Sequence, residues 1–153
     1  MRGCARAALA AAAVVLLVAG CGEGEPQGWE VEVPEAEFQD RAERVAGEWP
    51  GAVPAVGEVS DLLPLEGVRQ AGAGERSITM DLGHSACVMD DFGALVHETE
   101  EMVLVSGWGV AHPNASCTAQ MIVDPVRVRL DAELGDRRVV DAVSGEELAL
   151  PGR

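Results

Sequence analysis

The sequence predicts a mainly β domain of the α+β class: a small antiparallel β-sandwich or rolled sheet with one N-terminal helix. Three observations support this prediction. Short runs of alternating or β-branched residues follow one another from residue 77 onward, turn-forming residues separate these runs, and a single amphipathic segment precedes them. Strands at such spacing are typical of small antiparallel β folds, and the helix is expected to cover one side.

The helix is predicted over residues 34–47. Pro34 suits a first helical position, acidic residues follow it in the first turn, and Gly47 is placed to end the helix. Phe38, Ala42 and Val45 recur at helical spacing and continue to Trp49, which gives one narrow apolar stripe. The stripe is expected to pack on its own domain, since so short a helix is marginal in water without a surface to cover. The alternative is a docking helix for a partner.

Residues 50–74 are predicted to be an irregular connection. Pro50, Pro54 and Pro64 lie among many glycines, which confines any strand to a short edge piece such as 67–70.

Residues 77–150 form the β-rich part. Met102 to Val105 is apolar on both faces and is predicted to be central, whereas Val126, Val128 and Leu130 alternate with polar residues. Gly135-Asp136 and Ser144-Gly145 are predicted hairpin turns. The strands are expected at 77–82, 94–98, 102–108, 125–130, 138–141 and 147–150.

The N-terminus has the layout of a secretory signal. Arg2 and Arg6 are followed by an uncharged apolar run over residues 7–19, which is shorter than the roughly 20 residues of a spanning helix. The run ends in Val18-Ala19-Gly20-Cys21, which resembles the lipobox of bacterial lipoproteins. The resemblance implies that residues 1–20 are removed, that Cys21 carries lipid, and that the protein is held at the extracytoplasmic face of the cell membrane.

Residues 21–33 are predicted to be an acidic tether, and residues 34–150 a single globular domain. The chain has 11 basic and 26 acidic residues. Loss of Arg2 and Arg6 leaves 9 basic residues and a net charge of −17, which opposes nucleic-acid binding. Arg127, Arg129, Arg137 and Arg138 form the one arginine cluster, but aspartates are interleaved with them, so no basic patch is expected. The absence of lysine excludes Schiff-base chemistry.

Two cysteines remain if Cys4 leaves with the signal and Cys21 carries lipid. Export places Cys87 and Cys117 where disulfides persist, so a structural disulfide between them is predicted. The alternatives are a metal site or a redox pair.

The later part of the chain carries Cys87, His97-Glu98-Thr99, Cys117 and a closing segment over 126–145 that includes Leu134-Gly135-Asp136-Arg137. Over roughly residues 77–150 it resembles small uncharacterised cell-envelope lipoproteins of high-GC Gram-positive bacteria. The resemblance implies fold and location and carries no activity. The chain departs from that pattern at Ala132-Glu133, where a proline often precedes the Leu-Gly-Asp-Arg turn.

A metal-handling role is one alternative function. His84, Cys87, Met89, Asp90 and Asp91 lie within eight residues and suit a soft or borderline ion if Cys87 is free. If Cys87 is bridged, the remaining ligands match no closed zinc spacing or calcium loop, so no metal or other cofactor is predicted.

A small envelope hydrolase is the second alternative. His84, His97 and His112 are the only imidazoles, and Ser85, Ser106 and Ser116 lie near them in sequence, but no nucleophile elbow is formed. The prediction is therefore a non-catalytic binding or structural module whose protein or ligand partner the sequence does not identify. Trp108, between Gly107 and Gly109, is read either as a core residue or as an exposed stacking platform, with the core favoured.

Overall fold

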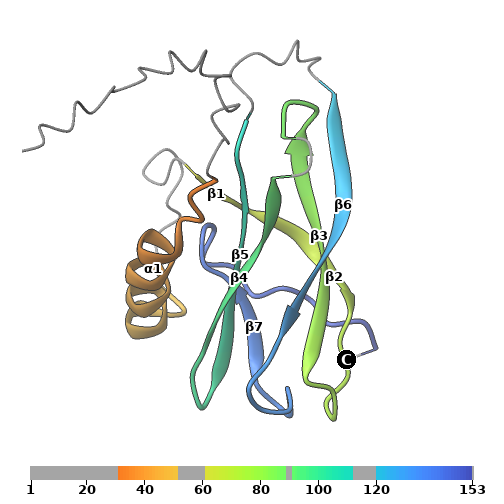
Figure 1. The fold of residues 1–153 in the computed structure, drawn as a ribbon. Helices are drawn as coiled ribbons and strands as arrows, with labels where there is room; N and C mark the ends of the chain where they lie inside the picture. The colour runs from red at the N-terminus through yellow and green to blue at the C-terminus, as the bar shows by residue number, and fades with distance from the viewer. Residues whose placement is uncertain (1–30, 52–60, 89–90, 112–119, 153) are drawn as a thin grey trace, which may run out of the picture. The chain divides into compact units, whose positions relative to one another are not determined.

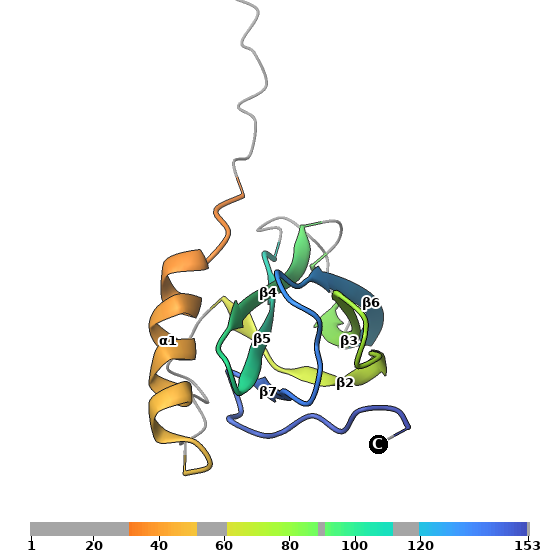
Figure 2. The same cartoon turned by 90° about the horizontal axis from the view of Figure 1, so that it is seen from below.

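The computed structural model describes residues 31–51, 61–88, 91–111 and 120–152. These belong to one compact unit, Val31–Arg153. In these ranges, seven strands form two facing sheets, and one helix lies on the outer side of one sheet (Figures 1 and 2). The elements are α1 (Glu35–Glu48), β1 (Leu62–Leu63), β2 (Leu65–Gln70), β3 (Ser77–Ser85), β4 (Phe92–Glu98), β5 (Met102–Gly109), β6 (Met121–Arg129) and β7 (Arg138–Asp141).

The first sheet is built around β5. Strand β4 pairs antiparallel with one edge of β5 along its whole length. The other edge is shared: β1 pairs with the end of β5, at Leu62 opposite Trp108, and β7 pairs with its beginning, at Arg138 opposite Met102. The β5–β7 pairing is parallel and is the one exception to an otherwise antiparallel arrangement among the described strands. The predicted central position of Met102–Val105 is confirmed.

The second sheet has the order β2-β3-β6. Strands β3 and β6 pair without interruption from Ser77 opposite Arg129 to Ser85 opposite Met121. The predicted alternation is confirmed, because Val126, Val128 and Leu130 are buried whereas the arginines between them are exposed. Pro125 lies within β6 and is tolerated there because β6 is an edge strand of this sheet.

Pro64 marks the corner where the chain passes from one sheet to the other. Strand β1 ends at Leu63 in the first sheet, and β2 begins at Leu65 in the second. Proline has no N–H to donate, so it suits a residue that leaves one ladder before joining the next. The strand expected over 67–70 therefore starts two residues earlier than predicted and is joined through this corner to a second short strand.

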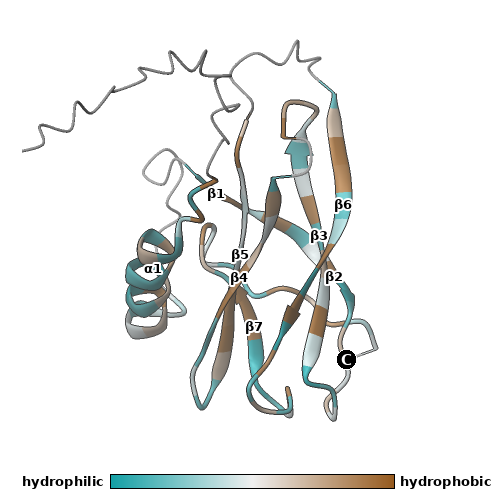
Figure 3. Cartoon of the chain, in the orientation of Figure 1, coloured by the Kyte–Doolittle hydropathy of each residue, from teal (hydrophilic) through white to brown (hydrophobic). Residues whose placement is uncertain are grey.

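Two apolar cores explain why β5 is apolar on both faces. Val103 and Val105 belong to the core between the sheets, whereas Met102 and Leu104 lie in the core under the helix. All four side chains are buried. Figure 3 shows the same arrangement as hydrophobic stretches along the strands that face one another.

The helix packs on its own domain, as predicted. Phe38, Ala42 and Val45 are fully buried against the outer face of the first sheet. Arg41, on the same helix, is also buried and donates from Nε to the Ala142 carbonyl oxygen at 2.8 Å and from Nη2 to that of Val143 at 3.4 Å. The helix is thereby joined to the segment after β7 by polar as well as apolar contacts.

Several predicted boundaries and one predicted turn are wrong. Strands β3 and β6 are each longer than expected, by three residues at the C-terminal end of β3 and four at the N-terminal end of β6. Residues 147–150 form no strand, only a bridge from Glu147 to Val140. Gly135 has a positive φ of 58°, as a turn glycine should, but it connects β6 and β7, which lie in different sheets, so no hairpin forms there.

Candidate functional site

His84 lies between the two sheets near one end of the sandwich. Its position on β3 continues the inward-facing series of Ile78, Met80 and Leu82, so alternation carries the imidazole into the interior. The ring stacks on Phe92 of the first sheet with 4.6 Å between ring centroids. His84 therefore joins the two sheets through an aromatic contact.

Both ring nitrogens of His84 contact oxygen atoms. Nε2 is 2.9 Å from Asp124 Oδ2, and Nδ1 is 3.0 Å from the carbonyl oxygen of Ser85. The Ser85 hydroxyl oxygen instead accepts a hydrogen bond from the backbone N–H of Cys87. A general base needs a ring nitrogen within reach of the group that it activates. The geometry at His84 is that of a structural hydrogen-bond network.

A shallow pocket of about 370 Å³ opens beside His84. The pocket is lined by apolar and polar residues at and near the adjoining ends of β3 and β6: Leu63, Gly83, His84, Ser85, Val88, Gln120 and Met121. Met121 and Val123, at 67% and 47% exposure, are exposed apolar side chains on the same face of β6.

The segment proposed for metal binding does not assemble a ligand set in the part of the chain that the structure describes. His84 and Cys87 lie near the end of β3, whereas Met89 and Asp90 fall outside the described residues. In the described ranges, no three His, Cys, Asp or Glu residues gather closely enough to hold a metal ion. His84 would have to give up the Asp124 or the Ser85 contact to ligate one.

His97 on β4 connects the first sheet to the helix. Its Nδ1 lies 2.7 Å from Gln39 Oε1, and the amide of Gln39 in turn donates to Glu35 Oε1 at 2.9 Å. The amide oxygen can only accept, so the ring nitrogen donates to it. The third imidazole, His112, and Ser116 lie outside the described residues, and Ser106 is buried and bonded to the Gly107 carbonyl oxygen.

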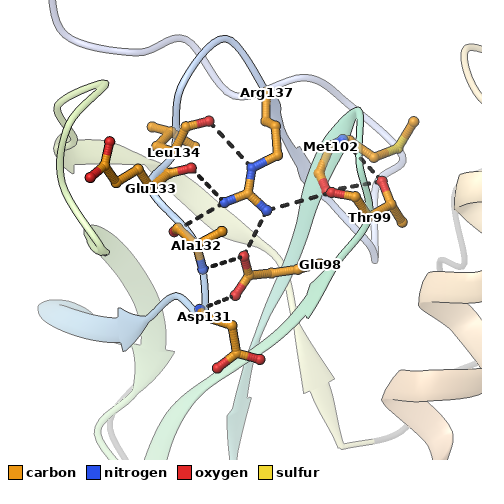
Figure 4. Close-up of polar contacts among 8 residues, drawn as sticks. All are labelled: Glu98, Thr99, Met102, Asp131, Ala132, Glu133, Leu134 and Arg137. Carbon is orange, nitrogen blue, oxygen red and sulfur yellow. Dashed lines mark hydrogen bonds and ion pairs between the residues drawn. The ribbon is translucent and has the colours of Figure 1, made fainter.

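The His97-Glu98-Thr99 motif and the closing segment over 126–145 meet in an ion pair, which we call the Glu98–Arg137 clamp (Figure 4). Arg137 Nη1 donates to Glu98 Oε2 at 2.6 Å, and the side chains are only 11% and 16% exposed. Glu98 ends β4, whereas Arg137 follows the Leu-Gly-Asp turn after β6. The clamp therefore ties the first sheet to the connection between the sheets.

Further hydrogen bonds saturate both partners of the clamp. The Glu98 carboxylate accepts from the backbone N–H of Asp131 at 2.5 Å and from that of Ala132 at 3.5 Å. The Arg137 guanidinium donates to four carbonyl oxygens, those of Thr99, Ala132, Glu133 and Leu134. With its donors engaged in this way, Arg137 is a structural residue. Glu98 and Arg137, which lie in two of the sequence motifs described above, therefore help to shape the fold.

Electrostatics at Glu98 favour the ionised form. Burial alone would raise the pKa of Glu98, but the hydrogen bonds from the backbone of Asp131, from Arg137 and from the backbone of Ala132 outweigh it, with the Arg137 charge adding to them. The pKa of Glu98 is therefore held below its ordinary value, as expected for a paired and hydrogen-bonded carboxylate.

Asp141 is a second acid with an altered pKa, and its role is also structural. Burial raises the pKa of Asp141, although several hydrogen bonds oppose that effect. The carboxylate accepts from the backbone N–H of Leu65 and Val143 and from the Ser144 hydroxyl. These donors lie at the Pro64 corner and in the turn at Gly145, whose φ of 73° fits the predicted Ser144-Gly145 turn. Asp141 thus fixes the corner and the turn together.

Trp108 packs against the core under the helix and is partly buried. Its indole covers Gly93 on the neighbouring strand, where an added Cβ would lie 2.8 Å from Nε1. Gly107 and Gly109 point to the opposite face, where Cβ atoms would collide with Leu82 and Val88. The core interpretation is the better one, since the flanking glycines let other parts of the chain approach β5.

Of the cysteines for which a role is predicted, only Cys87 lies within the described residues. Cys87 is buried, at 8% exposure, just after β3. Cys21 and Cys117 lie outside the described ranges, as does Trp29. Lipidation of Cys21 and the Cys87–Cys117 disulfide remain predictions.

The disulfide prediction has a direct test. Intact-mass measurement without reductant should give a mass about 2 Da below that of the reduced protein. Cys87→Ser should abolish this difference and lower the free energy of unfolding by about 3 kcal/mol, because a closed loop of about thirty residues constrains the unfolded chain. Equal masses with and without reductant would contradict the disulfide.

The four arginines that are interleaved with aspartates in the sequence lie in different environments in the structure. Arg127 and Arg129 project from the solvated face of β6, Arg137 is taken into the clamp, and Asp141 is buried. Arg138 pairs with Glu147 at 3.7 Å and stacks on Trp49, with 4.7 Å to the ring centroid. Arg127 and Arg129 are therefore exposed, and neither has a carboxylate partner among the described residues.

Comparisons with protein-family models, with characterised proteins and with solved structures found no match to this chain. Among the described residues, no helix combines the length and apolar character needed to cross a membrane.

Proposed function

We propose that this protein is a lipid-anchored component of the bacterial cell envelope that acts as a non-catalytic binding or structural module. The anchor would be lipid on Cys21, and residues 21–33 would tether the folded part to the extracytoplasmic face of the membrane. Support for the location comes from the basic start, the apolar run and the Val-Ala-Gly-Cys sequence at residues 18–21.

The non-catalytic part of the proposal rests on the hydrogen-bond partners of His84 and His97. His84 is held by Asp124 and the Ser85 carbonyl, and His97 is bonded to Gln39 of the helix. The two acids with altered pKa values, Glu98 and Asp141, are saturated by donors from the fold. The residues most suited to chemistry in the described ranges therefore join structural elements to one another.

The anchoring is tested by Cys21→Ser. The thioether to lipid requires the thiol, so this variant should lose metabolic labelling with a fatty acid and leave the membrane fraction. Two acyl chains hold a protein on a bilayer stably, at about 0.8 kcal/mol per buried methylene, so the change of fraction should be nearly complete. Cys4→Ser is the matched control and should keep both the label and the membrane location. Labelling that persists in Cys21→Ser would contradict the proposal.

The absence of catalysis is tested with His84→Gln and His97→Gln. Substrate panels for envelope hydrolases should give no turnover that depends on either imidazole, and an activity-based probe for serine hydrolases should form no adduct. A turnover that is lost in either variant, while the variant keeps its thermal unfolding transition, would show that the protein is an enzyme.

A further inference from the structure

Three arginines line one shallow pocket at the end of the second sheet. Arg76 directly precedes β3, and Arg127 and Arg129 lie on β6, where they stand opposite Thr79 and Ser77. All three arginines are exposed. Together with Ser77 and Val128 they line a hollow of about 520 Å³. The pairing of β3 with β6 brings Arg76 close to Arg127 and Arg129, which are more than fifty positions away in the sequence.

None of these arginines has a carboxylate partner among the described residues. The described arginine–carboxylate pairs are Arg69–Asp81, Arg137–Glu98 and Arg138–Glu147. Arg127 makes one hydrogen bond, from Nη2 to the Ser77 hydroxyl oxygen at 2.7 Å. Glu75 and Asp131 are close in sequence to the arginines of the pocket. In the described ranges, neither lies within ion-pair distance of Arg76, Arg127 or Arg129.

The overall charge makes this arrangement unusual. The chain has a formal net charge of −15 and 26 carboxylates, so an exposed arginine would readily meet an acidic partner. Three guanidinium groups that have no carboxylate partner in the described part of the chain line one hollow and form a local positive site on an acidic protein. Such a site attracts a small anion and is too small to hold a nucleic-acid backbone.

The chemistry of the lining favours a phosphate group. A guanidinium is planar and carries its N–H donors in a fork that matches two oxygens of a phosphate or carboxylate. Several forks with one hydroxyl can share the oxygens of a tetrahedral dianion, whereas one carboxylate has only two oxygens to offer. We propose that Arg76, Arg127 and Arg129, with Ser77, form a binding site for a phosphate group, carried by a soluble compound or by a lipid headgroup. This site does not depend on the proposed anchoring or on the absence of catalysis.

Titration of the purified protein with inorganic phosphate at low ionic strength tests the site. The arginine side-chain NMR signals should shift saturably, and acetate should bind about tenfold more weakly. The triple variant Arg76→Gln, Arg127→Gln, Arg129→Gln should weaken phosphate binding by at least about tenfold. A variant in which Arg127 and Arg129 are replaced by lysine should have a phosphate affinity between that of the original protein and that of the triple variant. Lysine keeps the positive charge but lacks the forked donors of arginine.

A charge-matched control separates the site from the general effect of charge. Replacing the exposed arginines Arg44, Arg69 and Arg138 by glutamine removes the same net charge at other places and should leave phosphate binding within about twofold of the original protein. All these positions are exposed, and an unchanged far-UV circular dichroism spectrum checks that each variant is folded. Equal losses in the two triple variants, or no saturable shift at tens of millimolar phosphate, would overturn the proposal.

Vesicles distinguish the two sources of the phosphate. If a lipid headgroup is the ligand, the Cys21→Ser protein should sediment with vesicles that contain phosphatidylglycerol and not with vesicles of phosphatidylcholine alone, and the site variant should stay in solution. If the vesicles fail to bind while inorganic phosphate does bind, the site takes a soluble phosphate compound. Vesicle binding that the site variant retains would count against this pocket as the lipid contact.

Discussion

Arg137→Ala should lower the free energy of unfolding by about 3 kcal/mol, the largest effect that we expect from a single polar substitution. The change leaves the partly buried Glu98 carboxylate without its ion-pair partner and removes the donor from four carbonyl oxygens. A buried charge that loses its partner is costly because it keeps the desolvation penalty without the compensation. Urea denaturation at neutral pH measures the difference.

Arg138→Ala is the matched control for this substitution. Its side chain is adjacent in sequence but half exposed, and its partner Glu147 is equally exposed. Even with the stacking on Trp49, its loss should cost no more than about 1 kcal/mol. If Arg137→Ala and Arg138→Ala were equally mild, Arg137 would not hold the fold together in the way that the structure indicates.

The contribution of Glu98 should also depend on pH. The pKa of Glu98 is lower in the folded protein than its ordinary value, so the carboxylate stabilises the fold above the ordinary carboxyl pKa, and this stabilisation is lost as the pH falls through the lowered pKa. Glu98→Gln should therefore be most destabilising at neutral pH, and its difference from the original protein should shrink in acid. A difference that grows in acid would contradict the assigned direction of the pKa.

Gly107→Ala should destabilise the protein by about 3 kcal/mol through overpacking. A Cβ at this position collides with Leu82 Cδ1 and lies 3.1 Å from the backbone oxygen of Leu63. Leu82 is fully buried in the core between the sheets, so it has no free space into which to turn. The two sheets would have to separate at this point, and thermal unfolding measures the loss.

Gly67→Ala is the control for an alanine introduced into a strand. No atom lies within 4 Å of an added Cβ at Gly67, and stability should stay within about 0.5 kcal/mol of the original or rise slightly. A double-mutant cycle identifies the clash: in a Leu82→Ala background, Gly107→Ala should cost at least about 1 kcal/mol less than it does alone. Additive effects would mean that Leu82 is not the obstacle.

The sequence by itself determined the class of the fold and the position of its helix. Hydrophobic periodicity is a local property, so the stripe of Phe38, Ala42 and Val45 predicted a helix that needs a surface, and the alternation around Val126 and Val128 predicted a strand with one buried face. The apolar run at Met102 to Val105 likewise placed β5 at the centre, because only a strand covered on both faces tolerates it.

Only the tertiary structure decided which distant residues meet. Nothing local to Glu98 or Arg137 predicts their ion pair, since it depends on the path of the chain between the sheets. The position of β7 is also a tertiary property. Because β7 pairs with β5 in the first sheet and β6 belongs to the second, the turn at Gly135 connects the two sheets. The arginines around Ser77 show the physical reason most clearly: strand alternation and register sort charges that are mixed along the sequence, so a pocket of one sign forms on a strongly acidic chain.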